Sequence, residues 1–207
     1  MSTRLPSLVL VLSAALCMGA DDPPIAEKPV IPTVDLDQVR EDKSLWLGKE
    51  IRFTMQLEAE LETWQAWVTR FGVEDYQAYS VWADSAFLWN LEDFHNTTPR
   101  IFARRGSLPE RQLVRRARYE RFEVRAVVRS IFHDEPWIEL LEVRPLKERL
   151  SQGTVIHGER AVKLMGENHY DLALGELERA RAGRLPKVAD AELGRLEELC
   201  RANIRED

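Results

Sequence analysis

The sequence is poor in the residues that build disulfide frameworks, metal sites and covalent catalysts. Its 207 residues include only four histidines and two cysteines, Cys17 and Cys200. It contains no Gly-rich phosphate loop, no Gly-x-Ser-x-Gly elbow and no His-Glu-x-x-His pair. The sequence therefore predicts no catalytic residue, no metal site and no cofactor. Its stability must come from a hydrophobic core rather than from disulfides.

Two positions come nearest to reactive chemistry. His133, Asp134 and Glu135 are consecutive, and consecutive residues in a turn point apart, whereas zinc needs converging ligands. We therefore expect a solvated turn there. Cys200 falls on the apolar stripe of an expected helix and should be a small core residue, because a reactive thiol needs an exposed, electropositive setting. A hydrolase without a recognisable motif is an alternative that would need carboxylates brought together by the fold.

Long apolar runs are also missing. The run at residues 8–16 is shorter than the ~20 residues that a membrane-spanning helix needs. With Arg4 before it and small residues after it, this run has the layout of a secretory signal. We expect cleavage near residue 20 and an extracytoplasmic protein, periplasmic or secreted. One alternative is a lipid-modified Cys17, because the residues before it partly resemble a bacterial lipoprotein box, although Leu16 stands where that box has a small residue.

Composition divides the remainder into three parts. Residues 21–44 place four prolines among charged residues, which favours an extended, solvated tether. Residues 45–147 alternate apolar and polar positions, the pattern of strands with one buried face. Residues 148–207 follow a helical period instead. We expect a signal at 1–20, then a tether, one domain of ordinary size and a helical extension.

The middle part predicts five strands and one helix. Alternation is clearest from Ile51 to Leu61, where every second residue is apolar. Ser107 and Glu110 form a capping box with a proline in the first turn, which predicts a helix to about Arg118. The other four strands are predicted at 77–83, 99–105, 121–128 and 137–143.

This order of elements resembles the OB-fold, a five-stranded Greek-key barrel. The resemblance covers roughly residues 45–146 and includes Leu47-Gly48-Lys49-Glu50-Ile51-Arg52-Phe53, which is similar to the first strand of many such domains. It implies an α+β fold with an OB-like barrel and one helix between strands. Because this fold hosts unrelated activities, the resemblance implies architecture more than function.

The C-terminal part resembles a single tetratricopeptide-type helix pair followed by a third helix. The residues that carry the likeness are Ala161, Tyr170, Ala173, Leu177 and Ala180, with Pro186 one place late. One such repeat cannot by itself form the groove that repeat arrays use. We therefore expect these helices to pack on the barrel or on each other, and a partner-binding role is the alternative.

Positive charge is concentrated in one stretch. The chain has a net charge of −6, yet residues 100–129 hold ten arginines and three glutamates. Arg111, Arg115 and Arg118 share one face of the expected helix, a basic band that would suit an anionic partner. The interpretation we favour is that these arginines pair with glutamates on neighbouring strands, such as Glu58, and cover apolar surface with their stems.

Strand parity places one candidate ligand site on the barrel. If Val81 faces the core, Trp82 points outward, and Phe102 and Arg104 point outward beside it on the third strand. The outer surface of strands two and three is the usual ligand face of an OB barrel, and aromatic rings with an arginine suit stacking on a base or a sugar. The alternative is that the tether or the C-terminal helices cover these aromatics.

The function expected from these observations is binding rather than catalysis. We expect an exported, non-catalytic binding or scaffolding protein that contacts another extracytoplasmic protein. The alternative is an oligosaccharide- or nucleic-acid-binding module that uses Trp82, Phe102 and Arg104.

Overall fold

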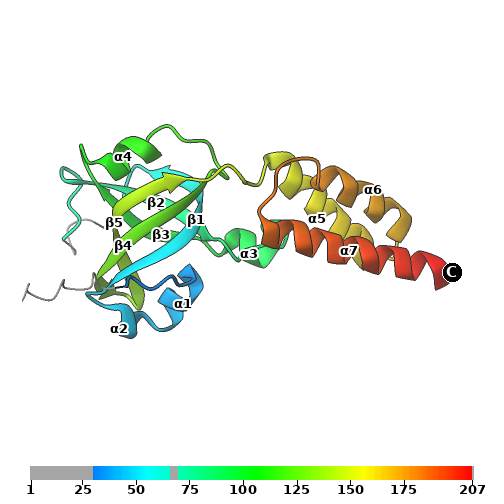
Figure 1. Ribbon diagram of the computed structural model, residues 1–207, viewed down its shortest axis with the longest axis horizontal. Helices are drawn as coiled ribbons and strands as arrows, with labels where there is room; N and C mark the ends of the chain where they lie inside the picture. Colours follow the sequence, from blue (N-terminus) through cyan, green and yellow to red (C-terminus); the bar gives the residue numbers. More distant parts are fainter. Residues whose placement is uncertain (1–29, 66–69, 207) are drawn as a thin grey trace, which may run out of the picture. The chain divides into compact units, whose positions relative to one another are not determined.

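The chain forms a closed five-stranded β-barrel followed by three helices (Figure 1). The computed structural model describes residues 30–65 and 70–206. The strands are β1 (Glu50–Leu61), β2 (Tyr76–Ala83), β3 (Thr98–Arg104), β4 (Arg121–Phe132) and β5 (Glu135–Pro145). Their order around the barrel is β1-β2-β3-β5-β4, and β4 closes the ring on β1. The α+β fold with a five-stranded barrel is thus confirmed, and the strand order is consistent with an OB-like barrel.

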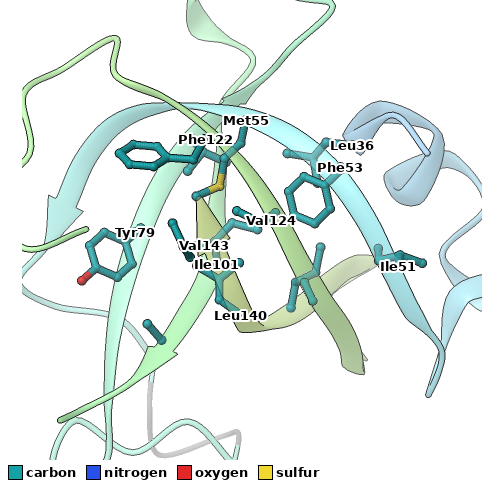
Figure 2. Close-up of a cluster of buried hydrophobic side chains, with 14 of the residues drawn as sticks. Leu36, Ile51, Phe53, Met55, Tyr79, Ile101, Phe122, Val124, Leu140 and Val143 are labelled. Atoms are coloured by element: carbon teal, nitrogen blue, oxygen red, sulfur yellow. The ribbon is translucent and has the colours of Figure 1, made fainter. Parts of the chain in front are cut away.

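The barrel interior is filled by the alternate residues of its strands. On β1, Ile51, Phe53 and Met55 are buried while Arg52 between them is exposed. Figure 2 shows these side chains converging with Val124 of β4 and others. Each strand therefore keeps one face in the core, as the period of two predicted.

Part of the interval expected to be a tether belongs to the barrel. Helix α1 (Leu36–Glu41) begins at Asp35, whose side chain accepts from the Asp37 amide, and α2 (Lys43–Trp46) follows it. Leu36 and Val39, one helical turn apart, are both fully buried in the barrel core, and Figure 2 shows Leu36 beside Phe53. This helix closes one end of the barrel interior. Residues 1–29, which include the expected signal, Cys17 and the start of the tether, lie outside the described residues.

The helix between β3 and β4 is shorter than the capping box predicts. Helix α4 (Leu108–Leu113) is capped by the Ser107 hydroxyl, which accepts from the Glu110 amide at 3.3 Å. It ends five residues before Arg118 because the chain then turns sharply, with positive φ at Arg115 and Tyr119. The turn allows the Tyr119 amide to donate to the carbonyl oxygen of Leu57 in β1 at 2.8 Å.

The C-terminal part consists of three helices whose buried side chains belong to a second hydrophobic cluster. They are α5 (Gln152–Gly166), α6 (Tyr170–Ala180) and α7 (Lys187–Glu206), and α6 packs against both of the others. Ala161, Leu177 and Leu193 are fully buried between them. Among the described residues, none of the helices combines the length and the apolar composition needed to cross a membrane.

The helices also pack on the connection between β2 and β3, which contains α3 (Leu91–His95). Trp89 of this connection is buried against α5, and a β-carbon placed on Gly158 would lie only 2.7 Å from the Trp89 β-carbon. Trp82 of β2 and Val155 of α5 belong to the same buried cluster. The expectation that the helices pack on the barrel or on each other is therefore met in both ways.

Candidate binding surfaces

Trp82 points away from the barrel interior, but other parts of the chain cover it. Its neighbour Val81 lies in the barrel core, whereas Trp82 is fully buried in the cluster that includes the C-terminal helices. The Tyr119 ring stacks on the indole at a centroid distance of 5.5 Å, and the indole N–H donates to the Phe94 carbonyl at 2.9 Å. The chain thus supplies the stacking partner that a ligand would otherwise provide.

Arg118 occupies the remaining approach to this indole. Its Cζ lies 5.0 Å from the Trp82 ring centroid, and its guanidinium is 3.1 Å from the Glu58 carboxylate. A cation over an aromatic face is attracted by the ring quadrupole. Arg118 therefore acts within the fold, where it closes the aromatic cluster and pairs with an acid on β1.

Phe102 and Arg104 lie in a different place from Trp82. Phe102 is fully buried in a separate aromatic cluster, where it stacks on Phe71 at 4.1 Å and on Trp137 at 5.1 Å. Arg104 is exposed, with its Cζ 5.9 Å from the Tyr76 ring centroid. The three predicted ligand residues are thus divided between two clusters and do not form one open platform. Ligand binding by these residues stays a prediction.

A small aromatic pocket opens beside Phe102. Its volume is about 240 Å³, and its lining includes Trp64, Arg100, Phe102 and Trp137. The Arg100 guanidinium lies over the Trp137 ring, 5.6 Å from its centroid. The Trp137 indole N–H is buried and has no hydrogen-bond partner among the described residues. Trp64 and Arg100 are the partly exposed members of this lining and can contact a flat ligand, whereas the protein covers the Trp137 N–H.

Most of the basic stretch is neutralised by ion pairs. The clearest case is Arg121, which forms two short hydrogen bonds, 2.5 and 2.6 Å, with the Asp84 carboxylate. This contact raises the pKa of Arg121 further above its usual value, chiefly through the hydrogen bond itself. The other arginines of this stretch with acidic partners are Arg105, Arg116, Arg118, Arg125 and Arg129. Of the basic band, Arg111 and Arg115 are exposed and have no ion-pair partner within the described part of the chain.

Side chains of the β2–β3 connection, α5 and α7 line another cavity, and Figure 1 shows α3 near the ends of these two helices. We call this cavity the helical groove. Its volume is about 640 Å³, and its lining includes Trp89, Leu91, Glu159, Val162, Glu192 and Leu196. A smaller pocket of about 130 Å³ shares Trp89, Leu91 and Glu159 with it and so extends the same surface. Its lining comes from three separate segments and mixes apolar side chains with polar and charged ones.

The helical groove leaves large apolar side chains exposed to solvent. Leu91 is 65% exposed and Val162 is 41% exposed. Val188 and Leu199, 54% and 44% exposed, lie on the same face of α7 as Glu192, because spacings of four and seven residues return to one side of a helix. Two exposed apolar residues therefore lie on this face of α7, with the Glu192–Arg195 ion pair between them.

The rim of the groove is acidic. Glu92 and Glu159 are exposed and have no ion-pair partner among the described residues. Glu192 is held by Arg195 through two hydrogen bonds of 2.7 and 2.9 Å, and this contact lowers the pKa of its carboxyl. Lys163 is the one cation in the groove lining. The charges that the chain leaves unbalanced at this surface are thus mainly negative.

His133, Asp134 and Cys200, the residues nearest to reactive chemistry in the sequence, lie in a turn and in the hydrophobic core. His133 and Asp134 form the tight turn between β4 and β5, both with positive φ, and Asp134 pairs with Lys43 at 3.1 Å. Cys200 is fully buried, and burial raises the pKa of its thiol. Within residues 30–65 and 70–206, no group of three or more histidine, cysteine or acidic side chains is placed to hold a metal ion.

Sequence reasoning found the outward face of β2 and β3 but missed the helical groove. The groove combines a strand connection with two helices far apart in the sequence, so no single pattern encodes it. One signal was available, because Val188 and Leu199 are apolar residues outside the core stripe of the last helix. No protein-family model matches this chain, and neither the curated proteins nor the solved structures contain a match.

Proposed function

We propose that this chain is an exported, non-catalytic binding or scaffolding protein that holds a protein partner in the helical groove. The observation that carries the proposal is the group of exposed apolar side chains around one concave surface. Single exposed apolar residues are common on proteins, but a contiguous apolar patch beside a cavity is typical of an interaction site. Leu91 is the most exposed of them.

The connection between β2 and β3 supplies part of the groove that three helices alone would not form. Helices α5 and α6 resemble one tetratricopeptide-type pair, with α7 as the first helix of a following unit, and α6 packs between them. A single pair lacks the neighbouring repeats that form a groove. Here Trp89 and Leu91, which come from the connection between β2 and β3, form the wall that a preceding repeat would supply. The barrel is therefore part of the proposed binding surface.

The proposal of a non-catalytic role rests on the same surfaces. The barrel interior is filled with apolar side chains, and the carboxylates of the groove come from three separate elements, Glu92 of α3, Glu159 of α5 and Glu192 of α7. General acid–base or nucleophilic chemistry needs paired groups within hydrogen-bond reach of one reacting atom. Binding makes no such demand.

A photo-crosslinking amino acid at position 91 tests the proposed groove. The chain would be expressed in its native host with the crosslinker at Leu91 or, as the control, at Leu172, a leucine on α6 with 57% exposure that does not line the groove. We expect one discrete protein adduct from position 91 and none from position 172. Leu91→Ser should also abolish co-purification of that protein. Identical adducts from both positions would contradict the proposal.

Export requires a separate test. The proposal is that residues 1–20 act as a removable signal, from Arg4, the apolar run and the small residues that follow. Mass spectrometry of the protein from the extracytoplasmic fraction should show an N-terminus near residue 21. An intact N-terminus in the cytoplasmic fraction would refute export.

The aromatic pocket of the barrel supports a second candidate function. If the domain is an OB-fold, this pocket offers the partly exposed Trp64 ring and the Arg100 guanidinium to a base or a sugar. Titration with single-stranded oligonucleotides and oligosaccharides, followed by tryptophan fluorescence, would detect such a ligand. Arg100→Gln should weaken binding, whereas Arg111→Gln should not, although both remove one arginine. Equal effects of the two variants would indicate non-specific attraction.

A further inference from the structure

The helical groove favours a helix over an extended strand as the secondary structure of a bound segment. The strands of the barrel are paired around a closed ring, so no free strand edge faces the groove on which an extended peptide could add a strand. The walls are side chains of helices and of one connection, which offer apolar contact rather than a ladder of backbone groups. An occupant that satisfies its own backbone hydrogen bonds therefore fits best, and that is a helix.

The separation of the two exposed apolar residues on α7 agrees with a helix of a few turns. Val188 and Leu199 are eleven residues apart on α7, which corresponds to roughly 16 Å at the rise of an α-helix. A second helix of about three turns, lying along α7, would place apolar residues at spacings of three and four against Leu91 and Val162.

The negative charge of the groove lining favours a bound helix that carries positive charge. Glu92 extends from α3 and Glu159 from α5, so unpaired carboxylates stand at two separate parts of the lining. Arg195 is already committed to Glu192, which leaves Lys163 as the cation opposing them. A nucleic acid would bring phosphates to this rim and be repelled. Lysine or arginine residues flanking an apolar stripe would be attracted.

We propose that the helical groove binds an amphipathic partner helix whose apolar stripe is flanked by lysine or arginine. The inference rests on the proposed function and adds the chemistry of the partner. The apolar stripe packs between Leu91, Val162 and α7, and the flanking cations lie against Glu92 and Glu159. Affinity then comes from apolar burial, and selection against acidic or neutral helices comes from the rim.

The test uses the full-length chain and two synthetic peptides of about 16 residues, long enough to form helix on a surface. Both carry leucines at helical spacings of three and four in an alanine background. One is flanked by lysines and the other by glutamates, and each has a fluorophore for anisotropy. We expect the lysine peptide to bind saturably and at least about tenfold more tightly than the glutamate peptide. The preference should shrink as salt is added.

Matched charge variants separate the rim from the general acidity of the chain. Glu92→Gln with Glu159→Gln should weaken the lysine peptide roughly tenfold. Glu178→Gln with Glu198→Gln removes two exposed acids outside the groove and should leave its affinity unchanged. All four positions are exposed, so the variants should fold, which a thermal melt checks. Equal weakening by both pairs would overturn the inference.

The outcomes distinguish this inference from the proposed function. Equal binding of the two peptides, lost for both in Leu91→Ser, would overturn the cationic partner while supporting a protein-binding groove. Binding of the lysine peptide that survives Leu91→Ser would place it elsewhere and overturn the inference. If neither peptide binds, the inference is wrong, and the crosslinking experiment at position 91 decides separately whether the groove holds a protein.

Discussion

Replacing Gly158 by alanine should destabilise the protein, although alanine is the better helix former. Gly158 lies inside α5, where Gly→Ala ordinarily stabilises a helix by about 1 kcal/mol. The added β-carbon would lie 2.7 Å from the Trp89 β-carbon and 2.9 Å from its Cγ. The Trp89 β-carbon is fixed to the backbone, so a rotamer change cannot move it away. Overpacking of this kind costs about 1–3 kcal/mol, which leaves a net loss of up to about 2 kcal/mol.

Gly175 provides the matched control. It lies in the middle of α6, and apart from its chain neighbours and the backbone of its own helix, no heavy atom lies within 4 Å of the position that its β-carbon would take. Gly175→Ala should therefore show the helix-propensity gain alone, up to about 1 kcal/mol. The two substitutions are chemically identical, so the difference between them isolates the contact of Gly158 with Trp89.

Urea unfolding followed by far-ultraviolet circular dichroism measures both variants. The midpoint should fall for Gly158→Ala and rise for Gly175→Ala, with an unchanged slope in each case. Tryptophan fluorescence should report the same midpoints if the barrel and the helices unfold as one unit. A gain of stability in Gly158→Ala equal to that of Gly175→Ala would refute the close packing of α5 on the β2–β3 connection.

Three further outcomes are expected from the same structure. Trp82→Ala should lower the free energy of unfolding by about 3–5 kcal/mol, measured by urea titration, because it empties a fully buried site under Tyr119. Cys200 should react with a thiol reagent only after denaturant is added, because burial excludes the reagent and raises the pKa of the thiol. Glu176 accepts a 2.6 Å hydrogen bond from His157, which lowers the pKa of its carboxyl below the usual 4.5. The stabilisation by this contact is therefore complete above about pH 4.5 and is lost as the pH falls through the lowered pKa. The free energies of unfolding of Glu176→Gln and the parent, measured by urea titration, should differ most near neutral pH and become equal in acid.

Strands such as β1 and β4 could be predicted because one of their faces is more deeply buried than the other. On β1 and β4 this one-sided burial forces apolar residues into every second position, and the pattern is visible without knowledge of the partner strands. The C-terminal helices were visible for the same reason, with apolar residues at spacings of three and four. The local periodicity of apolar residues was therefore enough to predict the strands and the C-terminal helices.

The exposure of individual residues could not be predicted in this way. Parity placed Trp82 outside the barrel, but its burial depends on Tyr119, which follows it by 37 residues and reaches it through a turn with positive φ. The helix at Leu36 was missed because its two buried residues stand in a proline-rich, charged segment where no pattern repeats. Which segments cover a surface depends on tertiary contacts, and a local sequence pattern carries no information about them.

The helical groove forms where the β2–β3 connection of the barrel packs against the C-terminal helices. Trp82 and Trp89 both come from the barrel and its β2–β3 connection, yet they belong to the same buried cluster as Leu177 and Leu193 of the helices. The helices therefore have no complete core without the barrel, and the groove has no wall on the side of Leu91 without α3. Because the two parts share a core, a partner bound in the groove would contact a surface whose shape is fixed by both, which is the rigid presentation that a binding surface needs.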